Sequence, residues 1–262
     1  MPHEIRQPDI EKLRAATLKN NIVWLESFGC TATASGGFVR VSHPELPDFT
    51  AWMVTDSKPE TRGAFAHSLS GSTLPDGFSI YVDDLVDVAE FPGLTTARLL
   101  PDISRVHTVT VQRNAIHASG PIAADEVGPE SLPLWVGLYG EGFDRNPEQR
   151  DLDARRWTRS MRDRHLRHWL FVENGVNVGV AQTCDSAGVT GIYSFTLRPQ
   201  YRQSGRTRFA VSAIVDKILG QEQVATLYFE RVSVADSRPP RRGSHSGRII
   251  RSYGHYVLTD RE

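Results

Sequence analysis

The stretch LRPQYRQSGRTRFAVSAIVDKIL, residues 197–219, leads from an apolar segment through arginines around one glycine into a predicted amphipathic helix. Backbone N–H groups at a helix N-terminus, with the helix dipole behind them, hold a pyrophosphate well. Glycine lets the backbone approach such a ligand closely, and a nearby arginine adds charge-assisted hydrogen bonds. The stretch therefore predicts a phosphate-binding turn, and Gly205 is the residue that this hypothesis most needs.

The segments around this turn indicate the fold, because the turn alone also suits an ordinary helix cap that holds no ligand. Two helices are predicted before it, over residues 129–143 and 146–169, followed by three antiparallel strands within residues 169–199. The segments ENGVNVG and CDSAG supply the two hairpin turns of these strands. After the turn come a strand, a short helix and a last strand, over residues 223–232, 243–254 and 255–259.

The N-terminal half is a mixed α/β region to which the sequence assigns no chemistry. A helix capped by Asp9 is predicted first, and the rest is short strands and a second helix. No low-complexity linker separates the two halves, so we expect domains over residues 1–110 and 111–262 that pack closely. The predicted strands cover residues 36–43, 49–55, 78–84 and 106–111, the second helix 59–71, and a helix or turn 89–101.

The order of these elements, with RQSGRT between a strand and a helix, resembles the GCN5-related N-acetyltransferase superfamily over about residues 105–260. The phosphate-loop motif of that family is Gln or Arg, two residues, Gly, one residue, then Gly or Ala. Arg202, Gly205 and Thr207 occupy these positions. The resemblance implies an α/β (α+β) fold with a mixed, mostly antiparallel sheet flanked by helices. It also suggests that the N-terminal half is a degenerate copy of this fold that walls the acceptor pocket.

The resemblance implies acetyl-CoA or another acyl-CoA as donor, no metal, and a small-molecule amine as acceptor. In the family, the strand before the loop pairs with the pantetheine arm of the donor, and the loop holds its phosphates. An ordinary buried strand and a ligand-free turn are the alternatives. The residues expected next to the donor are Phe195, Thr196, Leu197, Arg198, Arg202, Gln203, Ser204, Gly205, Arg206 and Thr207.

The acid and the base of an acyl transfer are harder to assign. Many family members use a Tyr in the last short helix as acid, but Ile250 stands at that position here, and a usual Asn is missing. Tyr253, one helical turn later, and His245 are the candidates for the acid. Glu173 and Asp185, at neighbouring strand ends, are the candidates for the base. An acceptor amine that is held in place could also react without a protein base.

Charge divides unevenly along the chain. Residues 1–130 carry 10 basic and 17 acidic residues, whereas residues 131–262 carry 20 basic and 14 acidic ones, so the second half suits an anionic ligand. Arginines gather in residues 155–169, where Asp151, Asp153 and Asp163 could pair with them, and in residues 238–251. Solvated, paired arginines are the preferred interpretation of the first cluster. The second cluster, together with the missing Tyr and Asn and with Thr207, favours a second hypothesis, in which an aminoacyl-tRNA or an acyl carrier protein is the donor. A third is a non-catalytic acyl-CoA sensor or protein-binding module.

Composition sets the remaining bounds. The 262 residues are 39% hydrophobic, which is enough for a sizeable core, and no stretch approaches the roughly 18 apolar residues of a membrane span. We therefore expect a soluble chain with no membrane partner. The two cysteines, Cys30 and Cys184, match neither a metal site nor a disulfide framework, so we expect buried free thiols in a reducing cytoplasm.

Overall fold

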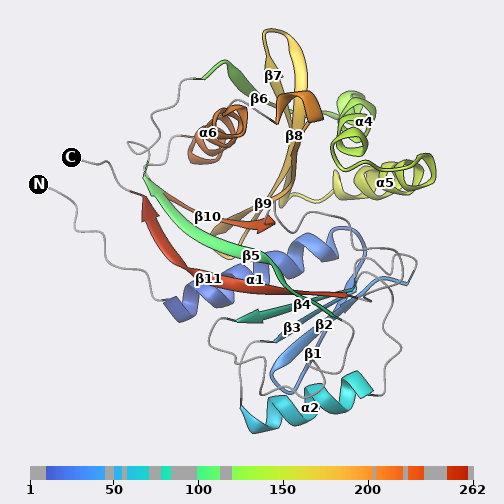
Figure 1. The fold of residues 1–262 in the computed structure, drawn as a ribbon, viewed down its shortest axis with the longest axis vertical. Coiled ribbons are helices and arrows are strands. Elements are labelled where there is room, and N and C mark those ends of the chain that lie inside the picture. The colour runs from blue at the N-terminus through green and yellow to red at the C-terminus, as the bar shows by residue number, and fades with distance from the viewer. Residues whose placement is uncertain are drawn as a thin grey trace, which may run out of the picture. The chain divides into compact units, whose positions relative to one another are not determined.

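The computed structural model describes most of the chain and divides it into two compact units (Figure 1). Unit 1 comprises Met1–Phe28, Val109–Tyr228 and His255–Glu262, and unit 2 comprises Gly29–Thr108 and Phe229–Gly254. The sequence analysis predicted two contiguous domains, 1–110 and 111–262, whereas each of these units combines separate segments of the chain. The contiguous domains stay a prediction. The described residues are 10–44, 50–54, 58–70, 78–83, 99–112, 120–202, 205–220, 224–232 and 247–258. Within these ranges, no helix combines the length and the apolar character that crossing a membrane requires.

The sheet of unit 1 has the strand order β6-β7-β8-β9-β10. Neighbouring strands from β6 to β9 are antiparallel, as predicted for residues 169–199. Both hairpin turns are confirmed, at Asn174-Gly175 and Ala187-Gly188, where all four residues have positive φ. Such pairs form the type I′ turns that match the twist of two strands. The strands are β6 Ile122–Glu126, β7 Leu166–Glu173, β8 Val176–Ser186, β9 Val189–Leu197 and β10 Val224–Val232.

Four α-helices lie in the described part of unit 1: α1 Ile10–Glu26, α4 Leu132–Gly142, α5 Pro147–Ser160 and α6 Arg206–Leu219. The start of α5 is well specified, because Asn146 and Gln149 form a capping box. The predicted helix over residues 146–169 is wrong beyond Ser160, since the chain turns there and β7 begins at Leu166. Most residues of β7 are buried in the sheet, and this burial outweighs the helical character of the arginine-rich segment.

Three helices of unit 1 cover one face of its sheet. His168 and Gln182 are register partners on β7 and β8, so their side chains lie on the same face. Trp24 of α1 and Ser160 of α5 hydrogen-bond to this pair, and the ring of Trp135 on α4 lies 5.1 Å from that of His168. Helix α6 lies on the opposite side of the sheet (Figure 1).

Unit 2 has the strand order β1-β2-β3-β4-β11. Strands β1 to β3 are antiparallel, whereas β3 and β4 are parallel and joined through helix α2, Pro59–Ser70. The rings of Phe38, Trp52 and Phe65, all at most 1% exposed, form its core with centroids 5.3 to 5.7 Å apart. The strands are β1 Thr31–Ser35, β2 Phe38–Ser42, β3 Ala51–Val54, β4 Phe78–Asp83 and β11 Gly247–Leu258, and β5 Leu99–Gln112 includes the strand predicted over residues 106–111.

The predicted short helix over residues 243–254 is wrong. Residues 247–254 lie in β11, which pairs in parallel with β4 in a register that places Ile249 opposite Ile80. Branched and aromatic residues favour a strand once a partner edge is present, and only the tertiary fold supplies that edge. The helix or turn predicted over residues 89–101 lies outside the described residues, except for residues 99–101 in β5.

Both units repeat one order of elements. In each, three antiparallel strands lead into a helix and then into a further strand of the same sheet: β1-β2-β3-α2-β4 in unit 2 and β7-β8-β9-α6-β10 in unit 1. The connection from Val54 to Pro59 in unit 2 is shorter than that from Leu197 to Arg206 in unit 1. The repeat therefore extends to the order of helices and strands but not to the arginine-rich turn.

Asn20, which is fully buried, is expected to hold α1 on the sheet of unit 1. Its Nδ2 donates to the carbonyl oxygens of Cys184 (2.7 Å) and Val189 (3.0 Å), and its Oδ1 accepts from the Tyr193 hydroxyl (2.8 Å). Asn20→Ala should lower the free energy of unfolding by about 3 kcal/mol, since it leaves these buried groups unpaired. Urea-induced unfolding measures this.

Lys19→Ala is the matched control, because Lys19 lies on the exposed side of the same helix. Its expected effect is below about 0.5 kcal/mol. Equal losses in the two variants would contradict the anchoring role of Asn20.

Candidate functional site

The connection from β9 to α6 is built for a close approach of backbone to ligand. A 3₁₀ turn at Pro199–Tyr201 follows β9, and Gly205 then precedes α6 with φ 73° and ψ 3°, in the left-handed region that favours glycine. Among the described residues, a Cβ on Gly205 would meet no atom within 4 Å, so the space in front of this backbone is open toward them. The neighbouring Gln203 and Ser204 lie outside the described residues.

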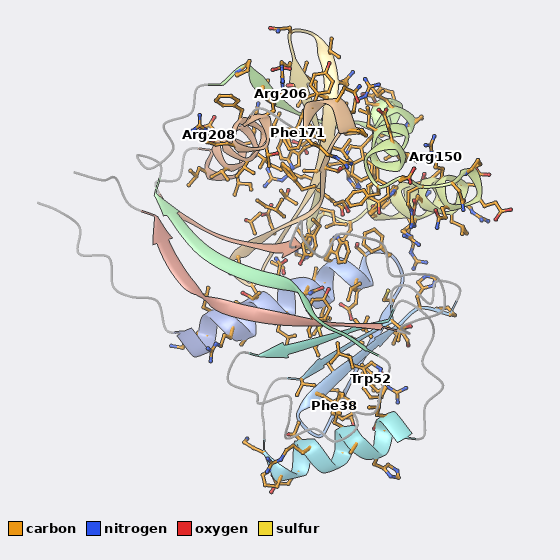
Figure 2. The ribbon with its side chains drawn as sticks, viewed as in Figure 1. Phe38, Trp52, Arg150, Phe171, Arg206 and Arg208 are labelled. Carbon is orange, nitrogen blue, oxygen red and sulfur yellow. The ribbon has the colours of Figure 1, made fainter. Side chains whose placement is uncertain are left out.

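The first turn of α6 carries positively charged side chains, whereas helix starts usually favour negatively charged ones. Within the described part of the chain, no side chain caps its N–H groups, and no acidic residue occurs in the turn. Arg206 and Arg208 lie there instead, beside the positive end of the helix dipole (Figure 2). Helix α5, by contrast, starts with a capping box and Glu148. A bound anion would relieve the unfavourable charge at α6.

Arg202, the first residue of the predicted motif, anchors the loop to the protein. Its Nε donates to the Leu197 carbonyl oxygen at 2.9 Å, and one terminal nitrogen donates to the Gly142 carbonyl oxygen and to Thr196 Oγ1. A Cβ on Gly142 would come within 2.3 Å of the Thr196 side chain. Only glycine therefore lets the end of α4 lie this close to Thr196. The described contacts of the Arg202 guanidinium therefore position the end of β9 and the end of α4.

Glu173 and Arg206 form an ion pair beside the loop. The Nε of Arg206 donates to both carboxylate oxygens of Glu173, at 3.1 and 3.0 Å, and its guanidinium carbon lies 5.4 Å from the ring centroid of Tyr201. The Glu173 side chain is only 9% exposed. The structure thus joins a residue that the sequence suggested as a base to a residue of the phosphate-loop motif.

Strand β9 carries a bulge in its middle that the sequence did not reveal. Val180 pairs with Thr196 and Gln182 with Tyr193, so Ala181 lies opposite two residues, Ser194 and Phe195. Ser194 has φ 51°, which is unusual and strained for a residue other than glycine. Such a bulge releases backbone groups from the ladder with β8 and re-aims side chains. Ser194 and Phe195 are half-buried, whereas Thr196 and Leu197 are buried.

A polar chain crosses the buried face of the sheet next to this bulge. Trp24 Nε1 donates to Gln182 Oε1 at 2.8 Å, which leaves the Gln182 amide nitrogen to donate to His168 Nε2 at 2.9 Å. His168 must therefore be neutral at Nε2, which lies 3.2 Å from Ser160 Oγ. Burial lowers the pKa of His168 to about 4.

Cys184 and Ser160 do not suit a covalent acyl-enzyme. Burial, with Asp163 and Asp185 contributing, raises the pKa of the Cys184 thiol to about 12, so it stays protonated. Ser160 and His168 lie in hydrogen-bond distance but are 0% and 2% exposed, out of reach of a substrate. Direct transfer between two bound substrates needs no such nucleophile.

The structure brings the predicted donor residues together but not the predicted acids. Phe195, Thr196, Leu197, Arg198, Arg202, Gly205, Arg206 and Thr207 all lie along β9, the loop and the start of α6. The backbone of Tyr253 lies in strand β11 rather than in a helix, so the one-turn relation to Ile250 is wrong. His245 lies outside the described residues. Asp185 pairs with Arg167 at 2.5 Å, at the far end of β8.

The first arginine cluster, residues 155–169, is partly paired within the protein. Arg156 contacts the fully buried Asp153 at 3.1 Å, and Arg145 contacts the same carboxylate. Arg155 and Arg159 are exposed on α5. Most of the second cluster, residues 238–251, lies outside the described residues.

Comparison with known proteins identifies the fold. No protein-family model matches the chain, and no curated protein matches it. A solved GCN5-related N-acetyltransferase from Kribbella flavida matches with a TM-score of 0.54 and 12% identity, covering 91% of this chain and 92% of that chain. A conserved protein of unknown function from Staphylococcus epidermidis matches with a TM-score of 0.51 and 10% identity, over 78% of this chain and 84% of that one.

The chain therefore has the fold of the GCN5-related N-acetyltransferases as a divergent example, and the resemblance predicted from the sequence is confirmed. The predicted mixed α+β architecture is confirmed with it. A match over 91% of the chain extends beyond residues 105–260, so the N-terminal half also takes part in the likeness. At 10% and 12% identity, the likeness concerns the fold alone.

The lowered pKa of His168 predicts a loss of stability in acid. The unfolded state, with the ordinary histidine pKa of 6.5, takes up a proton before the folded state, whose pKa is about 4. The stabilisation is therefore complete above about pH 6.5 and declines as the pH falls towards 4. Between pH 7 and pH 5, the free energy of unfolding should fall by about 2 kcal/mol more than in His168→Gln.

The His168→Gln variant keeps a hydrogen-bond acceptor for Gln182 but does not titrate, so it cancels the contribution of all other groups. Urea-induced unfolding at the two pH values gives both differences. Parallel pH dependences of the two proteins would contradict a neutral buried His168.

Proposed function

We propose that this chain is an N-acyltransferase that moves an acyl group from an acyl-CoA thioester to the amine of a small-molecule acceptor. The observation that carries the proposal is the bulged strand β9, which leads into the left-handed Gly205 and the cationic start of α6, where no described side chain caps the helix. A strand with released backbone groups suits a thioester arm, and the helix start suits its phosphates. The fold shared with a GCN5-related N-acetyltransferase supports the same activity.

The donor would lie along the residues from Phe195 to Thr207. The N–H groups of the first turn of α6 and the side chains of Arg206 and Arg208 would hold its phosphates. The open space in front of Gly205 fits a ligand that contacts the backbone. The backbone of Phe195 to Arg198 would hold the pantetheine arm, and Arg202 and Gly142 would keep this strand end in place.

The reaction needs a neutral amine, a stabilised oxygen and a proton for the leaving group. The neutral amine nitrogen attacks the thioester carbonyl carbon and forms a C–N bond, and the nitrogen then loses a proton to water. The C–S bond breaks, and the leaving thiolate takes a proton from the acid to become a thiol. Backbone N–H groups released at Ser194 and Phe195 would stabilise the charge that develops on the carbonyl oxygen. His245 stays a proposed acid, whereas Tyr253 loses the helical argument for that role because it lies in strand β11. Alignment of the two substrates itself contributes about 7 kcal/mol or more.

Gly205→Glu should remove donor binding. The new carboxylate would enter the open space at the start of α6 and repel the donor phosphates, so the affinity for acetyl-CoA should fall at least a hundredfold. Titration calorimetry with acetyl-CoA measures this, and an amine panel then tests turnover.

Gly188→Glu is the matched control. Gly188 also has a left-handed φ, 78° against 73° for Gly205, and a Cβ there would likewise meet no atom within 4 Å. Both variants therefore carry a similar strain of about 1–2 kcal/mol. Gly188 lies in the hairpin turn before β9, at the end of the strand away from the loop, so this variant should bind acetyl-CoA as the wild type does.

The two alternative hypotheses predict other results. A non-catalytic module would bind acetyl-CoA without acylating any amine of the panel. A carrier-dependent transferase would bind charged tRNA or an acyl carrier protein in place of acetyl-CoA, with an affinity that falls steeply as salt rises. Unchanged acetyl-CoA binding in Gly205→Glu would contradict a role of the loop in donor binding.

Two buried free thiols, Cys30 and Cys184, support the cytoplasm as the proposed place of action.

A further inference from the structure

Glu173 lies at the wrong end of the sheet to act as a base at the β9 bulge. It ends β7 and pairs with Val176 of β8, whereas the bulge residues Ser194 and Phe195 lie opposite Ala181 of the same strand. The two positions are five residues apart along β8. At about 3.3 Å per residue, this separation is about 17 Å, far beyond direct proton transfer.

The same end of the sheet lies beside the phosphate-binding loop. Gly179 pairs with Leu197, and the Arg198 N–H donates to the Val178 carbonyl oxygen at 2.9 Å, so the β7–β8 hairpin runs next to the end of β9. Glu173 therefore faces the loop, and its partner there is Arg206, the first residue of α6.

The contacts of Arg206 determine the orientation of its guanidinium. Both oxygens of Glu173 accept from Nε, and the Tyr201 ring lies under the guanidinium carbon at 5.4 Å. The Glu173 side chain is 9% exposed and that of Arg206 is 35% exposed, so a mostly buried anion holds a cation that reaches solvent. A cation held in one orientation loses less conformational freedom when it binds a planar or tetrahedral anion.

We propose that Glu173 is a positioning residue for the donor. It holds the Arg206 guanidinium at the start of α6, where that guanidinium binds a phosphate group of the donor. This inference rests on the proposed function, since it assumes a phosphate-bearing donor at the loop. It replaces the role of general base that the sequence suggested for Glu173.

A double-mutant cycle on coenzyme A binding tests the proposal without knowledge of the acceptor. Glu173→Gln keeps the size of the side chain but removes its charge, and it should weaken the binding of coenzyme A about tenfold. Arg206→Gln should weaken binding by at least as much. Because Glu173 acts through Arg206, the double variant should bind no more weakly than Arg206→Gln alone. Titration calorimetry on the full chain gives the four dissociation constants.

Asp185→Asn is the matched control. It breaks the Arg167–Asp185 ion pair at the opposite end of β8 and should leave coenzyme A binding unchanged. Urea-induced unfolding of every variant separates a loss of binding from a loss of structure. A merely structural Glu173 would add its effect to that of Arg206→Gln, and this additivity would overturn the proposal.

The remaining outcomes separate the inference from the function on which it rests. If the wild type binds coenzyme A and Glu173→Gln binds it equally well, the positioning role is wrong while the acyltransferase proposal stands. If the wild type binds no coenzyme A, the acyl-CoA-dependent function fails and the inference fails with it.

Discussion

The start of α6 imposes the constraint around which the site in unit 1 is arranged. Its first-turn N–H groups have no side-chain cap in the described structure, and two arginines add positive charge where a helix favours negative charge. The fold maintains this arrangement through contacts made elsewhere. Arg202 fastens the loop to the carbonyl groups of Leu197 and Gly142, and Glu173 neutralises Arg206 from the end of β7.

The opposite face of the same sheet is fixed by buried polar contacts combined with aromatic packing. Asn20 and Trp24 attach α1 to β8 and β9. From Gln182 the hydrogen bonds continue through His168 to Ser160 of α5. These directional contacts specify one arrangement of the helices in a way that apolar contacts alone would not. The bulge in β9 lies beside these contacts, opposite Ala181 of β8.

The prediction of the fold depended on local signals and failed where partners far apart in the sequence decide. The hairpin at Asn174-Gly175 was predictable, because Asn-Gly is a pair that tolerates positive φ at both turn residues. At Ala187-Gly188 only the glycine marks the turn, since alanine seldom adopts a positive φ. Residues 247–254 were not, because their strand forms against β4, more than 160 residues earlier in the chain. For the site, the loop was predictable from RQSGRT, whereas the bulge at Ser194 carries no comparable mark in the sequence.

The sequence by itself determined the order of helices and strands over residues 129–232, the glycine before α6 and the arginines around it, because each depends on neighbours a few residues away. Only the tertiary structure decided what those residues contact. Arg202 binds carbonyl groups of the protein, and Glu173 meets Arg206 because the β7–β8 hairpin folds back beside the loop. The physical reason is that an ion pair between residues 33 positions apart exists only when the sheet register places them together.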